Sequence, residues 1–161
     1  MKKLLFAACI CFGLGVQGQI NTDRPTQSYS PYVLPHGKVQ TELGFVSERP
    51  VSSLDQYNVT YLNALVRVSV LKWMELRLTE NYLGSRGGAE NISGLSPTTL
   101  GAKFHLHDQT NALPQVGLLT SFTFANGQDE FKANESTQDI RLLFQHDLSD
   151  NLTLDYNIGT F

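Results

Sequence analysis

Apolar and polar residues alternate along nearly the whole chain after residue 38, in about seven segments of roughly ten residues. In residues 62–70, for example, Leu62, Ala64, Val66, Val68 and Val70 alternate with Asn63, Arg67 and Ser69. The other segments are residues 38–47, 74–82, 100–107, 116–124, 139–145 and 152–159. A period of two is the geometry of a β-strand, whose successive side chains point to opposite faces. The sequence therefore predicts an all-β protein.

The polar positions of these segments carry charges of both signs, which is typical of a hydrated barrel interior. The candidates for lining this interior are Glu42, Arg67, Glu75, Arg77, Lys103, His105, Arg141 and Asp155. A segment of about ten residues is also long enough to cross a bilayer as a tilted strand. These features predict an antiparallel transmembrane up-and-down β-barrel. A soluble β-barrel with its apolar face inward is the alternative that alternation alone leaves open.

The predicted connections alternate between long and short, as in bacterial outer-membrane barrels, which have long outer loops and short periplasmic turns. The long ones are residues 48–56, 83–95 and 125–138, and the short ones are 71–73, 108–113 and 147–151. Trp73 at a turn and Tyr82 at a strand end suit the interfacial positions that aromatic rings favour. Tyr57 and Tyr61 would face the interior unless a β-bulge lies near residues 62–65.

The strand count predicts an incomplete barrel. Single-chain bacterial barrels use an even number of strands, eight or more. About seven are predicted here, and Phe161 lies on the polar face of the last one. An open sheet edge is unfavourable in hydrocarbon, because each unpaired amide or carbonyl costs several kcal/mol. We therefore interpret residues 38–161 as a partial barrel, truncated after about seven strands.

The first residues have the pattern of a secretory signal peptide, predicted over residues 1–18. Lys2 and Lys3 precede an uncharged apolar stretch, and small residues follow, so cleavage is expected after Gly18 or Gln19. A lipoprotein anchor at Cys9 or Cys11 is a weaker alternative, because little apolar sequence precedes either cysteine. Both cysteines leave with the signal peptide, so the mature chain has no thiol for a disulfide or a metal. The predicted location is the outer membrane of a Gram-negative bacterium.

Charge and motifs argue against several other classes of protein. The formal net charge is −3 and no basic patch is present, which argues against nucleic acid as a partner. Neither a G-x-S-x-G motif nor a phosphate-binding loop occurs, so we predict no catalytic residue, no cofactor and no enzyme activity. His105 and His107 lie two apart on one strand, but without a third ligand we interpret them as solvated histidines rather than a metal site.

Residues 19–37 are extended and punctuated by proline, and they precede the first predicted strand. One interpretation inserts this segment into the barrel as a plug, with Asp23 or Arg24 pairing with charges of the wall. The alternative is a periplasmic tail. For the wall charges themselves, we favour a mutually neutralising network over selection of cargo, because polar linings are general to these barrels.

Two stretches near the mature N-terminus carry a family resemblance. They are Thr22-Asp23-Arg24-Pro25-Thr26 and the stretch from Val33-Leu34-Pro35-His36-Gly37 to Gln40-Thr41-Glu42-Leu43-Gly44-Phe45. Together with Leu100-Gly101-Ala102-Lys103-Phe104 and the turn at Asp147–Leu152, they resemble the outer-membrane family of the meta-pathway of phenol degradation, whose members are often labelled transporters. The resemblance implies a closed barrel of more than seven strands for small hydrophobic or aromatic molecules. The chain departs from the pattern at Ala125-Asn126-Gly127, where a proline-containing turn is expected.

We therefore expect an outer-membrane channel or transport protein for small molecules, with the hydrophobic or aromatic cargo class implied only by the resemblance. The expected partners are outer-membrane lipid, the small-molecule cargo and the barrel-assembly machinery. Two alternatives remain. An outer-membrane hydrolase would lose lipid hydrolysis when His105 or His146 is replaced, and a soluble periplasmic ligand-binding barrel would be recovered without detergent.

Overall fold

The computed structural model describes residues 22–23, 28–48, 57–86, 91–111 and 113–160. Its strands are β1 (Val39–Glu48), β2 (Tyr57–Leu71), β3 (Met74–Arg86), β4 (Ile92–Leu95), β5 (Thr99–His107), β6 (Gln115–Thr123), β7 (Thr137–Ser149) and β8 (Leu152–Thr160), with one 3-10 turn, η1 (Asp129–Phe131). Each of the seven segments that alternate in sequence lies in a strand to within one residue at its ends, so the all-β prediction is confirmed. No helix in the described part of the chain is long and apolar enough to cross a membrane.

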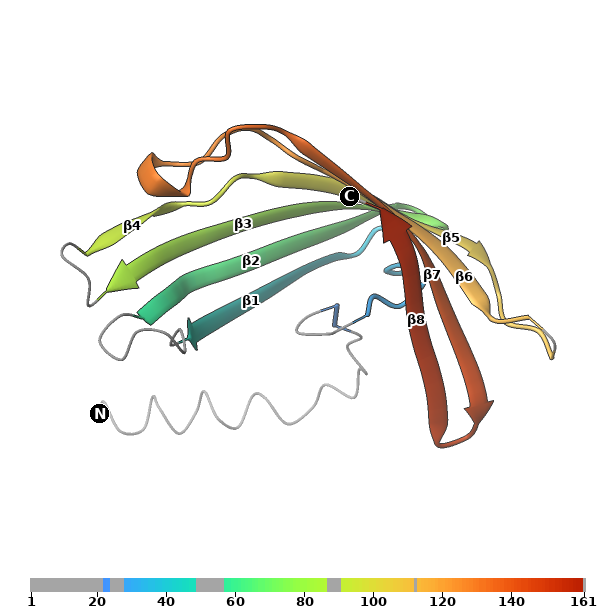
Figure 1. Ribbon diagram of the computed structural model, residues 1–161. Coiled ribbons are helices and arrows are strands. Elements are labelled where there is room, and N and C mark those ends of the chain that lie inside the picture. The colour runs from blue at the N-terminus through green and yellow to red at the C-terminus, as the bar shows by residue number, and fades with distance from the viewer. Residues whose placement is uncertain (1–21, 24–27, 49–56, 87–90, 112, 161) are drawn as a thin grey trace, which may run out of the picture.

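The strands form one antiparallel sheet in the order β1-β2-β3-β5-β6-β7-β8, and β4 pairs with the far end of β3. Apart from the short β4, neighbours in the sheet are therefore neighbours in sequence, which is the up-and-down topology that was predicted. Figure 1 shows that the sheet curls strongly, so that β8 turns down toward the side on which β1 lies. Within the described residues β1 and β8 are the two edges, and the sheet is a curled half-barrel.

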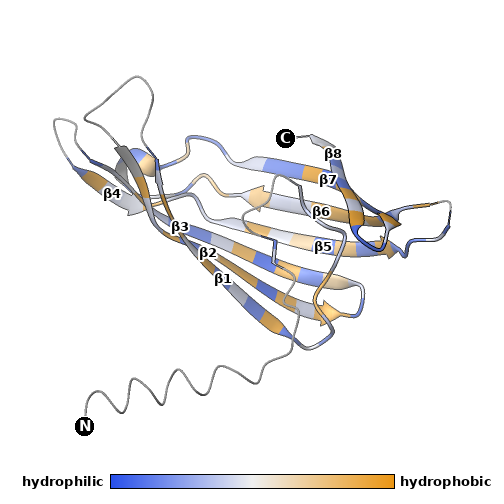
Figure 2. Cartoon of the chain, turned by 90° about the horizontal axis from the view of Figure 1, so that it is seen from below, coloured by the Kyte–Doolittle hydropathy of each residue, from blue (hydrophilic) through white to orange (hydrophobic). Residues whose placement is uncertain are grey.

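The register places the alternating residues on two different surfaces of the curled sheet. Directly paired residues share a face, and Glu75 is opposite both Ser69 and Lys103, whereas Leu76 is opposite Val68 and Ala102. The coloured bands in Figure 2 alternate between hydrophilic and hydrophobic along the strands. The outward apolar residues are exposed on the convex surface; among them are Leu43, Leu62, Leu76, Leu78, Leu100, Phe122, Ile140, Leu142, Tyr156 and Ile158.

A β-bulge in β2 explains the tyrosine that did not fit the alternation. The pairing of β2 with β3 shifts between Thr60 and Leu62, which leaves Tyr61 as the extra residue. The Tyr61 ring lies 5.7 Å from the ring of Tyr82, which is exposed on the outward face. A bulge near residues 62–65 was the condition under which Tyr57 and Tyr61 would not face the interior, and it occurs one residue earlier. The side chain of Tyr57 lies outside the described part of the chain.

The prediction of a long loop over residues 83–95 is wrong. β3 continues to Arg86, and β4 pairs with it in the register Leu83↔Gly94 and Ser85↔Ile92, so most of this stretch is a hairpin. The stretch is rich in Gly, Ser and Asn, which are weak strand formers, but cross-strand pairing decides the structure here. Pro97 separates β4 from β5, because proline has no N–H to donate to the ladder.

Candidate functional site: an ion cluster under the N-terminal segment

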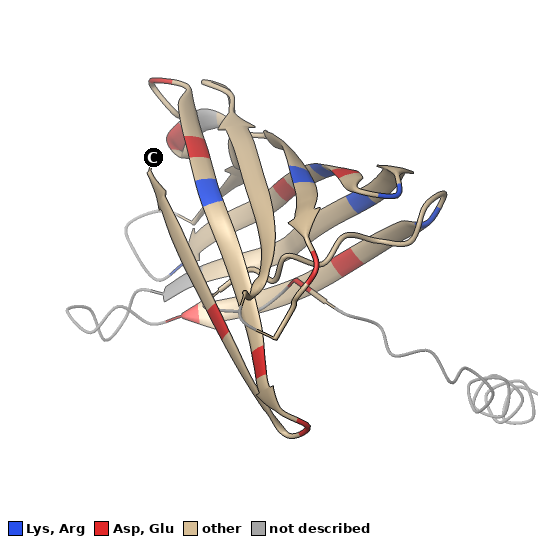
Figure 3. Cartoon of the chain, turned by 90° about the vertical axis from the view of Figure 1, so that its right-hand side faces the viewer, with Lys and Arg blue, Asp and Glu red and all other residues tan. Residues whose placement is uncertain are grey.

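Six charged side chains meet on the concave face of the sheet, and we call them the ion cluster. They are Asp23 from the N-terminal segment, Glu42 from β1, Arg67 from β2, Glu75 and Arg77 from β3, and Lys103 from β5. Arg67, Glu75 and Lys103 are each 0% exposed, and Asp23 is 4% exposed. Elsewhere on the strands, charges of both signs are interspersed (Figure 3). A buried charge is tolerated only when it is paired, so the contacts of each group matter.

Arg67 is bound by two glutamates from the strands on either side. Its Nε lies 2.9 Å from Glu75 Oε1 and its Nη2 lies 2.9 Å from Glu75 Oε2, which is the bidentate geometry that favours arginine over lysine. Its Nη1 lies 3.3 Å from Glu42 Oε1. Arg77 Nη1 also donates to Glu75 Oε1, at 2.8 Å. These contacts link β1, β2 and β3 across the concave face.

Asp23 adds the sixth charge from outside the sheet. Its Oδ2 accepts hydrogen bonds from Arg77 Nη1 and from Lys103 Nζ, the latter at 2.5 Å, and lies 3.8 Å from Arg67 Nη2. Its backbone N–H donates to the Glu42 carboxylate at 3.2 Å. Burial raises the pKa of Asp23, but the attraction of Lys103, Arg77 and Arg67 outweighs burial, so the pKa lies below its usual value. Asp23 is therefore held as a carboxylate.

The charges of the ion cluster balance only when Asp23 is included. The wall contributes three cations, Arg67, Arg77 and Lys103, against two carboxylates, Glu42 and Glu75. The carboxylate of Asp23 compensates the remaining positive charge. The N-terminal segment and the sheet are thus electrostatically complementary at this point.

The rest of the N-terminal segment, residues 28–37, runs across the concave face. The backbone N–H of Leu34 donates to Glu75 Oε2 at 2.9 Å. Lys103 Nζ donates to the carbonyls of Ser30 and Tyr32, at 3.1 and 3.3 Å. A Cβ built on Gly117 in β6 would lie only 3.0 Å from Pro31 Cα, so the absence of a side chain at Gly117 permits this close approach.

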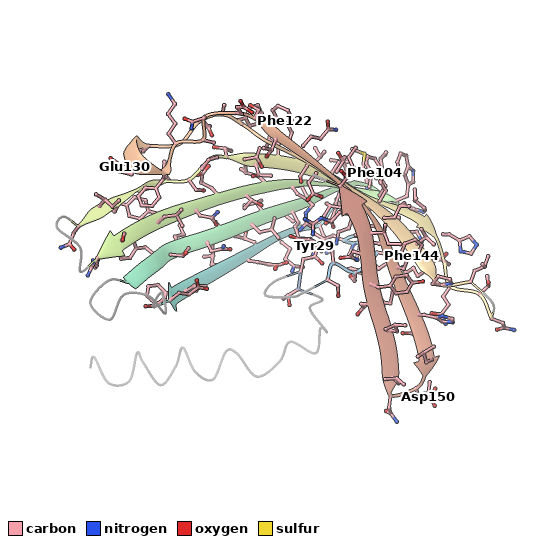
Figure 4. The ribbon with its side chains drawn as sticks, viewed as in Figure 1. Tyr29, Phe104, Phe122, Glu130, Phe144 and Asp150 are labelled. Carbon is pink, nitrogen blue, oxygen red and sulfur yellow. The ribbon has the colours of Figure 1, made fainter. Side chains whose placement is uncertain are left out.

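Tyr29 connects the N-terminal segment to β8 and to two arginines of the sheet. Its backbone N–H donates to Asn157 Oδ1 at 2.7 Å, and Asn157 Nδ2 donates back to its carbonyl at 2.8 Å. The ring lies between two guanidinium groups, with Arg77 Cζ and Arg141 Cζ each 5.7 Å from its centroid, which is cation–π distance. Arg141 in turn pairs with Asp139. Figure 4 shows Tyr29 under the sheet, while Phe122 projects from the convex side.

Two cavities lie beside the sheet. The smaller, about 70 Å³, is lined by Tyr29, Arg77, Thr79, Thr99, Gly101, Leu119 and Ser121. The larger, about 400 Å³, is lined by Val46, Glu48, Val59, Thr60, Leu83, Gly84 and Phe131, and it lies toward the ends of β1, β2 and β3 that are remote from the ion cluster. The smaller cavity therefore adjoins both Tyr29 and a member of the cluster.

The structure brings together most, but not all, of the residues that the sequence singled out. Glu42, Arg67, Glu75, Arg77 and Lys103 form one cluster with Asp23, whereas Arg141 contacts it only through the Tyr29 ring. Asp155 is opposite Gln145 near the β7–β8 turn and is exposed. Arg24 lies outside the described residues, as do the predicted signal peptide and all but the first residue of the long connection predicted at residues 48–56; that residue, Glu48, ends β1.

The two histidines of β5 are separated by a register shift. His105 is opposite Gly117 on the concave face, its Nε2 lies 3.0 Å from Asp108 Oδ1 and its Nδ1 lies 3.3 Å from Gln115 Nε2. His107 is opposite Val116, whose side chain belongs to the convex face. The register shift therefore separates the side chains of the two histidines, which lie only two residues apart in the sequence.

Sequence reasoning missed two kinds of residue on the concave face. Leu65, Leu119 and Leu143 occupy polar-face positions and are 1%, 5% and 0% exposed. The alternation does place them inward, but the sequence left open whether the N-terminal segment covers this face or forms a periplasmic tail. Tyr29 and Asn157 were also missed, because a contact between residues that are 128 positions apart leaves no local pattern.

Comparison with known proteins gives one result. No significant match was found among curated proteins or solved structures. A family model described as "Putative MetA-pathway of phenol degradation" matches residues 22–161, which include all eight strands and the described N-terminal segment. This is the family that the N-terminal motifs resemble. The chain therefore belongs to the family of the MetA-pathway of phenol degradation.

Proposed function

We propose that this chain belongs to an outer-membrane β-barrel that conducts small molecules and whose interior is occupied by its own N-terminal segment. The observation that carries the proposal is the inverted distribution of side chains. Large apolar residues such as Leu43, Phe45 and Ile158 are 64–67% exposed, while Arg67, Glu75 and Lys103 are 0% exposed. In water this arrangement exposes apolar area and buries charge, both of which are unfavourable. In a bilayer the same apolar face contacts lipid.

Outward aromatic pairs support the membrane assignment. Trp73 stacks on Phe104 at 6.1 Å, near the end of the sheet that contains the β2–β3 turn. Phe122 and Phe124 meet edge to face at 5.1 Å near the opposite end. Aromatic residues at both ends of the strands are typical of outer-membrane barrels, where they lie at the two membrane interfaces.

The lengths of the connections at the two ends of the strands also support the membrane assignment. The β2–β3 and β7–β8 turns at one end are short, whereas β6 and β7 are joined at the other end by a longer stretch that contains η1. We assign the short turns to the periplasm, where the N-terminus enters, and the longer connection to the outside. Export by the predicted signal peptide, insertion by the barrel-assembly machinery and contact with outer-membrane lipid belong to this proposal. It gives the chain no catalytic role.

The cargo class rests on the family and not on the sheet. The family description names phenol degradation, so the proposed cargo is a small aromatic or hydrophobic compound. The N-terminal segment lies where such a molecule would pass, because it contacts residues of β2, β3, β5, β6 and β8 on the concave face. Passage therefore requires part of this segment to move.

The membrane assignment is tested with adjacent cysteines on opposite faces of β5. Residues 19–161 contain no cysteine, so a thiol introduced there is a unique label once every other cysteine of the mature gene product is replaced by serine. Leu100→Cys faces outward and Thr99→Cys faces inward, where Thr99 Oγ1 lies 2.8 Å from Thr123 Oγ1. In vesicles that contain the full-length gene product, brominated lipid should quench a fluorophore at residue 100 and not at residue 99.

Transport is tested separately by vesicle swelling. Vesicles carrying the full-length gene product should admit small neutral solutes faster than vesicles prepared with detergent alone. Equal quenching at both cysteines, or recovery of the protein from the periplasm without detergent, would contradict the membrane assignment. A protein that shows the quenching difference but no swelling would contradict only the transport function.

A further inference from the structure

The carboxylate of Asp23 occupies an anion-binding site that is built almost entirely by the wall of the sheet. Arg67 from β2, Arg77 from β3 and Lys103 from β5 all direct a nitrogen at Asp23 Oδ2. The three cations lie on adjacent strands of the sheet. Arg67 and Arg77 are themselves held by Glu42 and Glu75, so their positions do not depend on Asp23 alone, whereas Lys103 contacts Asp23 and the carbonyls of the N-terminal segment. Convergent, buried donors of this kind bind a carboxylate strongly.

The net charge of the five wall residues determines which charge a ligand must carry to bind at the position of the Asp23 carboxylate. Without Asp23, the five wall members of the ion cluster carry one net positive charge. A monoanion compensates it, a dianion would leave an uncompensated charge beside Glu42 and Glu75, and a neutral molecule would leave the excess cation buried. The site therefore suits a single carboxylate.

An aromatic position adjoins this carboxylate position. Arg77 donates to the Asp23 carboxylate with Nη1, and its Cζ lies 5.7 Å from the centroid of Tyr29. Arg141 lies at the same distance from the ring. The cavity of about 70 Å³ beside Tyr29 also contains the buried side chain of Leu119, which adds an apolar surface. One guanidinium thus contacts both a carboxylate and an aromatic ring.

We propose that Asp23 and Tyr29 occupy a binding site for a small aromatic monocarboxylate, so that the N-terminal segment acts as a built-in competitor of the cargo. The proposal rests on the proposed function and names the substrate class. The carboxylate of the cargo takes the place of the Asp23 carboxylate between Arg67, Arg77 and Lys103. Its ring takes the place of the Tyr29 ring between Arg77 and Arg141. Binding releases the segment from the cluster.

The test is equilibrium binding of benzoate to the full-length gene product, refolded in detergent and followed by calorimetry. In Asp23→Ala the competing carboxylate is removed, so benzoate should bind at least about tenfold more tightly than to the wild type, because the site is no longer mostly occupied. Acetate should bind more weakly than benzoate because it lacks the ring, and benzyl alcohol should not bind because it lacks the charge. Asp150→Ala, in the exposed β7–β8 turn, is the matched control and should behave as the wild type.

A second pair of variants keeps the proposal testable if Asp23→Ala does not fold. Asp23→Asn retains a hydrogen-bond acceptor without the charge, and it should show the same preference for benzoate over benzyl alcohol. Adding Lys103→Met to either Asp23 variant should abolish benzoate binding, whereas adding Lys38→Met, at the exposed start of the sheet, should not. Equal binding of benzoate to the wild type and to the Asp23 variants, or equal effects of benzoate and chloride, would overturn the proposal.

This experiment is independent of transport. Tight benzoate binding by a protein that admits no solute would contradict the proposed channel and leave the site intact. Solute passage by a protein whose Asp23 variants do not prefer benzoate would contradict the site and leave the channel intact.

Discussion

At the scale of single residues, the ion cluster depends on groups that are buried together and satisfied together. Lys103 is 0% exposed, and its Nζ contacts Asp23 Oδ2 and the carbonyls of Ser30 and Tyr32. Its three donors are therefore used on the N-terminal segment rather than on the sheet. Arg67 in contrast binds mainly Glu75 and Glu42, which belong to the sheet. The two cations have different tasks: Arg67 joins strands, and Lys103 joins the segment to the strands.

Removing Lys103 should strongly destabilise the folded protein. Lys103→Met leaves Asp23 with fewer cations and two carbonyls without a donor, and breaking a buried ion pair costs about 3–5 kcal/mol. Lys38→Met removes an exposed lysine and should change the free energy of unfolding by less than about 0.5 kcal/mol. The measurement is urea unfolding of both variants in lipid vesicles. Similar unfolding curves for the two variants would show that the cluster contributes little.

The contribution of Asp23 should depend on pH. Its pKa in the folded state lies below the ordinary value of 3.8, because Lys103, Arg77 and Arg67 favour the carboxylate. The folded protein therefore binds fewer protons than the unfolded chain near this pH, so the stabilisation is complete above pH 3.8 and is lost as the pH falls toward the folded pKa. The wild type should be more stable than Asp23→Asn at pH 7, and the difference should shrink below pH 3.8. A difference that stays constant down to pH 2 would contradict this assignment.

At the scale of elements, the strands could be predicted from the sequence, but the burial of the concave face under the N-terminal segment could not. Alternation identifies the inward and outward residues of the seven long segments except beside the register shifts, such as those at Tyr61 and His107, because every second side chain of a regular strand faces the same side. One of the two interpretations of residues 19–37 also paired Asp23 with the wall charges. It did not indicate that β4 pairs with β3, nor that Leu65, Leu119 and Leu143 are buried, because these facts depend on long-range pairing and on what covers the concave face. Local propensity contains neither kind of information.

The contact between β6 and the N-terminal segment makes a prediction at Gly117. Gly117→Ala places a Cβ 3.0 Å from Pro31 Cα and 3.1 Å from the Phe104 carbonyl, so the segment must shift, at a cost of about 1–3 kcal/mol. Gly44→Ala, on β1, is the control, because its Cβ meets nothing nearer than 3.8 Å. Limited proteolysis should cleave near residues 28–33 faster in Gly117→Ala than in Gly44→Ala. Equal rates would mean that this contact does not retain the segment.

The two faces of β7 make another prediction. Leu142 is 42% exposed on the outward face, and Gln145 lies on the concave face opposite Asp155. In vesicles, Leu142→Arg should lower the free energy of unfolding by about 2–4 kcal/mol, because an arginine near the bilayer centre must leave water. Gln145→Arg should have a much smaller effect, because it adds a cation beside Asp155. The reverse order in urea unfolding would show that the convex face is not in contact with lipid.

At the scale of the whole molecule, the sheet has an apolar outer surface and a charged inner surface that is filled in part by its own N-terminal segment. The membership in the phenol-degradation family and the curled antiparallel sheet agree with this arrangement. The segment lies against the concave face, where the ion cluster and the Asn157–Tyr29 pair hold it. In the proposed channel, a solute path would depend on the equilibrium between the bound and the released segment.

The most direct test is planar-bilayer conductance of the full-length gene product, compared between the wild type and Asp23→Ala. We predict steady ion-conducting steps for both proteins, with longer or larger openings for Asp23→Ala, because that variant lacks the carboxylate that ties the segment to Arg77 and Lys103. The absence of conductance from both proteins, although each is folded and inserted in the bilayer, would contradict the account.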